Sequence, residues 1–302
     1  MSCPFCGADS APDLIAWDRN REVSDARFAY RRCEACATIF LASPPEDLAR
    51  YYAADYFDFA PDGVAHWRTS DFLRGVEQFR VDRLRRYVQP GPLIEIGSGA
   101  GAVASVARDG GVDVTALEMD ARGCEHLRDD VGVTAINSDR PIEALAGLPA
   151  VSVVAMWHSF EHLPNPGEVL DVIAEHIEPG GILALGVPNP DSLEFRLLGP
   201  RWPHLDAPRH LSLVPASALR DRARTLGFSV VELLTNDPFG RHCNQHGWSA
   251  GFARRPARGV SAWARTGGLI ATKALAPVEA RGLRGAAMLM LLRKDASGRG
   301  RD

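Results

Sequence analysis

Four of the six cysteines stand in two pairs near the start of the chain, Cys3-x-x-Cys6 and Cys33-x-x-Cys36. Two thiolates separated by two residues can hold one face of a metal ion, and a second pair completes the tetrahedron that Zn²⁺ accepts. Two disulfides are the alternative, but the chain shows no export signal and the cytosol keeps thiols reduced. The spacing therefore predicts a closed, structural Zn²⁺ site with these four cysteines as ligands.

A glycine-rich segment could bring the backbone close to a ligand. Residues 95–101 read EIGSGAG, continue an apolar run, and precede a helix-like stretch that begins at residue 102. Glycines permit a sharp turn and close contact with a ligand at the N-terminus of the next helix. The next apolar run ends at Glu118, 21 residues beyond Gly97, where a carboxylate can accept hydrogen bonds from both ribose hydroxyls of a nucleoside. The pattern predicts a site for a nucleoside-containing cofactor.

Two classes of cofactor fit this loop, and Glu95 discriminates between them. Gly97, Gly99 and Ala102 match the pattern of a dinucleotide site, which predicts NAD. A carboxylate at position 95 would repel the pyrophosphate of NAD, whereas S-adenosylmethionine (SAM) presents an ammonium group and a sulfonium cation. We therefore favour SAM, and an NAD-dependent oxidoreductase is the first alternative.

The segments that must position these residues alternate between short apolar runs and amphipathic stretches. The runs that predict strands cover residues 93–96, 112–117, 133–136, 151–157 and 182–187, with further strands at 228–234 and 287–292. The stretches that predict helices cover residues 72–88, 102–109, 121–129, 141–147, 166–177 and 215–226. This alternation predicts an α/β fold with a parallel sheet covered on both faces.

Shifts in composition divide the chain into five predicted parts. Residues 1–45 form the zinc-ribbon module, which ends at a proline-containing turn. Residues 46–90 form a helical segment rich in aromatic residues, which could be a lid over a pocket or could pack on the core. Residues 91–239 form the cofactor-binding core, 240–285 a basic insertion, and 286–302 the last strand and tail.

Composition and charge restrict the function further. The chain is 46% hydrophobic and 24% charged, as in ordinary globular proteins, and it lacks about 20 uninterrupted apolar residues. We therefore expect no transmembrane segment and a cytoplasmic location. The net charge is −4, and residues 1–50 carry 6 Arg against 8 acidic residues, which argues against nucleic acid as a partner. Residues 241–302 carry 12 Lys and Arg against 3 acidic residues, so this region could contact an anionic substrate or membrane surface, or be a solvated basic face.

Together these motifs resemble class I SAM-dependent methyltransferases. Residues 95–101 resemble motif I of that family, and the segment WHSFEHLPNP at 157–166 resembles the EHL-x-x-P segment of its ubiquinone-biosynthesis-like and sugar-modifying branch. Residues 202–211 look like a segment of bacterial members that carry an N-terminal zinc ribbon. The resemblance covers roughly residues 45–240 and 286–294. It implies a seven-stranded Rossmann-like sheet whose last strand is antiparallel.

The resemblance also implies roles for individual residues. The loop glycines would contact the methionine part of SAM, Glu95 would belong to the network around its amino group, and Glu118 would bind the ribose. The predicted cofactor-binding residues are Glu95, Gly97, Ser98, Gly99, Gly101, Glu118, Met119, Ser138, Trp157, His158 and Tyr56. The implied acceptor is a small molecule, namely a sugar, lipid-linked glycan, phenol or specialised metabolite, with oxygen as the favoured target atom. An rRNA or tRNA methyltransferase that uses the zinc module is a further alternative.

Removal of a proton from the acceptor requires a base, and the predicted catalytic candidates are His162, His158, Glu161 and His210. Methyl transfer from SAM is an in-line displacement that needs the nucleophile about 3 Å from the methyl group. Histidine suits the base because it titrates near neutral pH. Structural roles are the alternatives: His162 could brace a turn, Glu161 could only orient it, and Arg209-His210 could bind an anionic substrate or anchor a loop.

Overall fold

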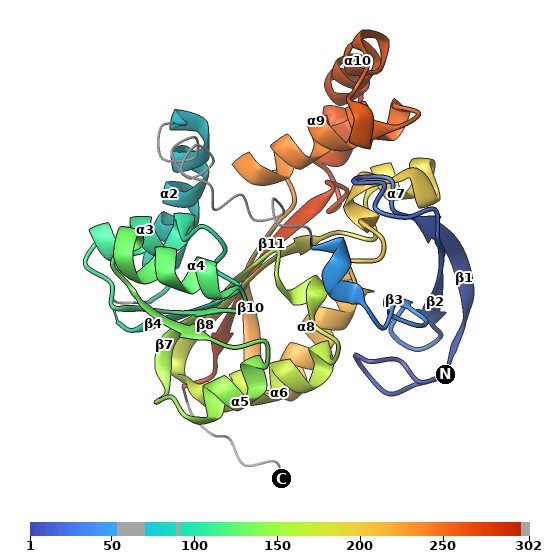
Figure 1. Cartoon of the computed structure of the whole chain (residues 1–302). Coiled ribbons are helices and arrows are strands. Elements are labelled where there is room, and N and C mark those ends of the chain that lie inside the picture. Colours follow the sequence, from blue (N-terminus) through green and yellow to red (C-terminus); the bar gives the residue numbers. More distant parts are fainter. Residues whose placement is uncertain (53–69, 89–90, 297–302) are drawn as a thin grey trace.

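The computed structural model describes residues 1–52, 70–88 and 91–296, and its largest sheet has seven strands (Figure 1). These are β4 (Leu93–Ile96), β5 (Val114–Glu118), β6 (Thr134–Asn137), β7 (Val151–Trp157), β8 (Ile177–Pro188), β10 (Phe228–Leu234) and β11 (Ala287–Lys294). Their order is β10-β11-β8-β7-β4-β5-β6. Strands β4 to β8 run parallel, and β11 is antiparallel to both of its neighbours. The predicted seven-stranded sheet with an antiparallel last strand is confirmed.

Successive apolar residues of the strands pack on opposite faces of this sheet. Ile94 and Val154 belong to one apolar cluster, and their neighbours Leu93 and Val153 belong to another. The first cluster is covered by α5 (Pro141–Ala146), α6 (Pro166–His176) and α8 (Ala216–Thr225). The second is covered by α2 (Asp71–Arg85), α3 (Ala102–Asp109) and the π turn Leu127–Val131 that follows α4 (Ala121–His126). Burial on both faces explains why the strands are apolar at almost every position.

A second sheet of four strands combines the start of the chain with a strand from its second half. Its strands are β1 (Ser10–Trp17), β2 (Arg27–Cys33), β3 (Ile39–Leu41) and β9 (Ser212–Leu213), all paired antiparallel in that order. A third apolar cluster joins Tyr30 and Ile39 of this sheet to Trp202 and Leu205. The N-terminal sheet is therefore packed against the segment between β8 and β9.

Two helices occupy most of the predicted insertion between β10 and β11. They are α9 (Pro238–Phe252), which contacts the short helix α7 (Leu193–Leu198), and α10 (Ala262–Glu279), which projects from the body (Figure 1). The carboxylate of Glu279 joins the two helices, because it accepts hydrogen bonds from Asn244 Nδ2 (3.0 Å) and Trp248 Nε1 (2.8 Å).

The outer side of α10 exposes apolar residues, with Trp263 and Ile270 more than half exposed. Within the described ranges no helix is long and apolar enough to cross a bilayer. Contact between this basic region and a membrane surface stays a prediction of the sequence.

Candidate active site

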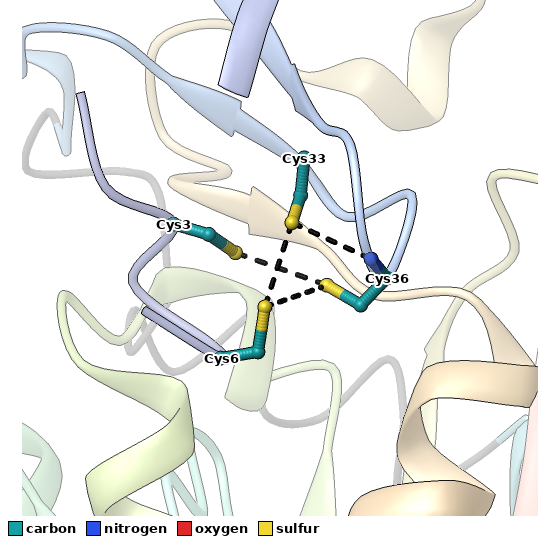
Figure 2. A group of neighbouring side chains, drawn as sticks. All are labelled: Cys3, Cys6, Cys33 and Cys36. Carbon is teal, nitrogen blue, oxygen red and sulfur yellow. Dashed lines mark hydrogen bonds between the residues drawn. The ribbon is translucent and has the colours of Figure 1, made fainter. Parts of the chain in front are cut away.

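The four paired cysteines meet in one cluster (Figure 2). Sγ of Cys6 lies 3.4 Å from Sγ of Cys33 and of Cys36, and Sγ of Cys3 lies 3.8 Å from Sγ of Cys36. Four sulfurs at about 2.3 Å from a tetrahedral Zn²⁺ would be about 3.8 Å apart, so this spacing fits one ion. The thiols form no disulfide, and the backbone amide of Cys36 donates to the sulfur of Cys33.

The loop between β4 and α3 requires glycine at two positions. Gly97 has a φ of 74°, and a Cβ there would lie 2.5 Å from Cβ of Ser159. Gly101 has a φ of 73°, and a Cβ there would lie 2.6 Å from a methyl group of Leu127. Both positions combine a left-handed backbone with no room for a side chain. Because Ser159 follows β7, the glycine loop packs directly against the segment that carries the catalytic candidates.

Glu118 ends β5 beside this loop. Its carboxylate accepts hydrogen bonds from the backbone amides of Gly99 (2.9 Å), Met119 (2.8 Å) and Asp120 (3.1 Å). Burial raises the pKa of Glu118, although these hydrogen bonds act in the opposite direction. The carboxylate is thereby fixed at the strand end next to the glycines, the position from which a ribose would be bound.

The other residues expected near the nucleoside lie at the ends of β5 and β6. Met119 is 54% exposed. The backbone amide of Ser138 donates to the carbonyl of Glu118 at 3.0 Å, which holds the two strand ends together. Tyr56 lies outside the described residues, so its predicted contact stays a prediction.

Glu95 lies in β4 immediately before the loop. Its side chain is buried, and Oε2 has no hydrogen-bond partner among the residues that the structure describes. Burial, followed by the nearby charge of Glu77, raises the pKa of Glu95 to about 8. Ser98 Oγ donates to the backbone carbonyl of Glu95 at 3.3 Å. A buried carboxylate oxygen without a donor is costly, and the cationic amino group of SAM could donate to it.

Helix α2 supplies residues that the sequence analysis did not identify. Arg80 forms a 2.8 Å ion pair with Glu77, and its guanidinium lies 4.8 Å from the ring centroids of both Trp157 and Phe239. Such cation–π contacts fix the side chain of the predicted cofactor residue Trp157. One signal was present in the sequence, because Arg80 stands four residues after Val76 on the apolar side of the helix.

The four catalytic candidates converge after β7. His158 follows the strand, Glu161 and His162 lie in the 3-10 turn Phe160–His162, and His210 comes from the segment before β9. Oε1 of Glu161 is 3.4 Å from Nδ1 of His158 and 3.8 Å from Nε2 of His210. The rings of His162 and His210 are 4.7 Å apart between centroids. The structure thus brings all four into one cluster, which we call the His–Glu cluster.

His158 is the member of this cluster with an unusual backbone. It has a φ of 55°, a left-handed conformation that is uncommon for residues other than glycine and is often found at functional sites. Its backbone amide donates to the carbonyl of Gly186 at 2.7 Å. The side chain is 26% exposed, while that of Glu161 is 2% exposed. His158 is therefore the cluster residue held at the surface of the site.

Neighbouring charges define the protonation of the cluster. Burial alone would raise the pKa of Glu161, but contact with His158 and the charges of His158, His210 and His162 outweigh it and hold the pKa at about 2. Burial, with a smaller effect of His210, lowers the pKa of His162 to about 4. Near neutral pH, Glu161 is therefore ionised and His162 is neutral.

The His–Glu cluster lines a cavity of about 790 Å³. Residues 20–21, 203–210 and 239–260 contribute to the same cavity, with further imidazoles from His204, His242 and His246. The volume is in the range of sites for small molecules. His158 lines this cavity, and the next residue, Ser159, packs against Gly97, so one short segment links the cavity wall to the glycine loop.

Arg209 was predicted either to bind an anionic substrate or to anchor a loop, and its contacts match the second role. Its guanidinium is fully buried and forms ion pairs with Asp18 (2.8 Å) and Asp206 (2.7 Å). These ion pairs connect the end of β1 to the loop before β9. Leaving either partner unpaired inside the protein would be strongly destabilising, so Arg209 holds the cavity wall.

The profile of a family described as "Methyltransferase domain" matches residues 64–233, more than half of the chain. A ubiquinone biosynthesis O-methyltransferase of Psychrobacter arcticus is 27% identical over 122 residues, which are 36% of this chain and 46% of that protein. The corresponding enzyme of Caulobacter vibrioides is 28% identical over 161 residues, 48% of this chain and 63% of that protein. The chain spans about half the length of the curated relatives it matches.

Solved structures share the fold at low sequence identity. A SAM-dependent methyltransferase from Archaeoglobus fulgidus has a TM-score of 0.51 and 18% identity, and the match covers 76% of this chain and 96% of that one. A mycolic acid cyclopropane synthase, complexed with S-adenosylhomocysteine (SAH), has a TM-score of 0.51 and 16% identity, and the match covers 74% and 85%. At this identity the likeness supports the architecture of the sheet and not a substrate.

Proposed function

The chain belongs to the methyltransferase-domain family, and on that premise we propose that it transfers the methyl group of SAM to an oxygen of a small molecule bound in the cavity. One observation carries this proposal. The His–Glu cluster lines a cavity of small-molecule size, directly beside a glycine loop whose neighbouring carboxylates, Glu95 and Glu118, suit the two polar ends of SAM. The names of the ubiquinone O-methyltransferase relatives favour oxygen as the target atom.

We assign the cofactor contacts as follows. When bound, SAM supplies a methyl group on a sulfonium cation, which is an electrophile. The buried carboxylate of Glu95 would bind the amino group, and Glu118 would accept hydrogen bonds from the ribose. Gly99 has a left-handed backbone with open space where a side chain would lie, so the ligand can approach the main chain there.

His158 is the proposed general base. Its ring lines the cavity, and it can take the proton of the acceptor hydroxyl as the oxygen forms its bond to the methyl carbon. Glu161 is ionised and 3.4 Å away, so its charge stabilises the imidazolium that results. His162 is less suited because its pKa of about 4 makes it a weak base. The acceptor class, a sugar, lipid-linked glycan, phenol or specialised metabolite, follows from cavity size and the resemblance.

Titration calorimetry with SAM, SAH and NADH tests this function. We expect micromolar binding of SAM or SAH and no binding of NADH, because the buried carboxyl of Glu95, once ionised, attracts a cation and repels pyrophosphate. Incubation with phenols and glycosides, followed by mass spectrometry and NMR of the product, then tests for a methyl ether. Binding of NADH alone would refute the proposal.

The four-cysteine cluster is proposed to hold a structural Zn²⁺ ion. The purified protein should contain one zinc per chain, and Cys36→Ser should lose that zinc and lower the melting temperature by roughly 5 °C, since metal binding contributes to folding. Elemental analysis and thermal unfolding measure both. Cys124→Ser changes a thiol outside the cluster and should keep its zinc. Unchanged zinc content in Cys36→Ser would show that these thiols are not the ligands.

A further inference from the structure

We propose that Glu161, His162 and His210 form a divalent metal site in the wall of the cavity, separate from the four cysteines. One ligand atom from each of the three residues lies within 4.8 Å of the others. Binding of the ion can be tested without any assumption about the reaction. Only its role in activating the acceptor rests on the function proposed above.

The first support is the environment of Glu161. Its side chain is 2% exposed, and neither carboxylate oxygen has a hydrogen-bond partner in the part of the chain that the structure describes. A buried carboxylate whose two oxygens lack donors is unfavourable, and a bound cation would compensate for the missing contacts. The groups around it are imidazoles, which are common metal ligands.

The second support is the orientation of the two histidines. Nδ1 of His210 lies 2.9 Å from the backbone carbonyl of His204, and Nδ1 of His162 lies 3.0 Å from that of Arg209. A carbonyl oxygen can only accept, so Nδ1 of His210 carries the proton and its Nε2 carries the lone pair. Nδ1 of His162 is also held by the hydroxyl of Tyr52 at 2.9 Å, which can donate or accept. Metal-binding histidines are usually held in this way by a backbone oxygen or carboxylate.

The third support is the spacing. Nε2 of His210 is 3.8 Å from Oε1 of Glu161, too long for a charge-assisted hydrogen bond of about 2.7–2.9 Å. Ligands at about 2.1 Å from one ion lie roughly 3.0–3.4 Å apart. The three side chains therefore need only a small inward movement to bind an ion, whereas they form no hydrogen bonds with one another at their present distances.

The donor set indicates the class of ion and its role. Two imidazoles and one carboxylate suit Mn²⁺, Fe²⁺, Co²⁺ or Zn²⁺, and three protein ligands leave positions open toward the cavity. An acceptor hydroxyl bound there would have a lowered pKa. Its proton would pass to His158, the oxygen would form a bond to the methyl carbon, and the bond from carbon to sulfur would break to leave neutral SAH.

A titration with Mn²⁺ tests the site. The loss of the EPR signal of free Mn²⁺ measures how much of the ion is bound. Mn²⁺ prefers oxygen and nitrogen ligands, so it avoids the four thiolates. We expect one Mn²⁺ per chain and an affinity that falls roughly 10-fold or more in Glu161→Gln and in His210→Ala. The matched control is His242→Ala. This variant loses an imidazole that lines the same cavity but is not one of the three proposed ligands, so it should bind Mn²⁺ as the wild type does.

Binding of SAH, measured on the same variants, separates the possible failures. Variants that still bind SAH but lose Mn²⁺ support the metal site in a folded protein. Mn²⁺ binding that is absent from the wild type, or equal in Glu161→Gln, overturns the site and leaves Glu161 as a partner of the histidines alone. Suppose that Glu161→Gln and His210→Ala lose Mn²⁺ and that neither the wild type nor any variant binds SAH. This result would support the metal site and refute the methyltransferase proposal.

Discussion

Binding of SAM at pH 7 should release close to one proton per molecule, and the affinity for SAM should rise between pH 6 and 7.5. Burial holds the pKa of Glu95 at about 8, so this carboxyl is mostly protonated at pH 7 before the ligand binds. The cationic amino group needs the ionised form, so the proton must leave on binding. The range ends at pH 7.5 because an α-amino group itself begins to lose its proton near pH 8. Calorimetry in two buffers of different ionisation enthalpy measures the released proton.

Glu95→Gln should abolish this proton release and weaken SAM binding by roughly 10- to 100-fold at pH 7.5, because a buried hydrogen bond to a charged group is lost. Glu143→Gln is the matched control, since Glu143 is an exposed carboxylate on α5 that pairs with Arg140. It should bind SAM like the wild type. Proton release that persists in Glu95→Gln would mean that another group titrates on binding.

His158→Asn should lower kcat by about 100- to 10,000-fold, the usual contribution of a general base, while SAM affinity stays within about twofold. Asparagine is chosen because it tolerates the left-handed backbone of His158 (φ 55°) better than alanine. Steady-state kinetics with an identified acceptor and calorimetry with SAM give the two readouts. His176→Asn replaces a histidine at the end of α6, away from the cavity, and should leave kcat unchanged.

The pH profile gives a second check on this assignment. Glu161, with a pKa of about 2, and His162, with a pKa of about 4, do not change protonation above pH 5. Neither group can therefore cause a fall of kcat above pH 5, and if His158 is the base, His158→Asn should remove any such fall that the wild type shows. If the variant kept both the rate and the acidic limb of the wild type, His158 would not be the base.

The sequence by itself determined the sheet and the cofactor loop, because both depend on local patterns. Strands expected at 93–96 and 151–157 and the helix at 102–109 have the same bounds in the structure. Other bounds differ from the expected ones where contacts with neighbouring elements outweigh the local sequence pattern. Strand β8 begins at Ile177 instead of residue 182. The helix expected at 121–129 ends at His126 and continues as a π turn. The glycines of the loop were identifiable because a left-handed backbone requires them.

Only the tertiary structure decided how the site is assembled. The two-residue strand β9 has no pattern of its own and exists because β3 pairs with it. His210 reaches Glu161 across 49 residues of sequence, and the buried ion pair of Arg209 with Asp18 joins segments 191 residues apart. These contacts form when separate elements pack together. Burial then raises the pKa of Glu95, and the neighbouring histidines lower that of Glu161 in spite of its burial. The sequence therefore supplied the candidate residues, and long-range packing selected which of them face one another.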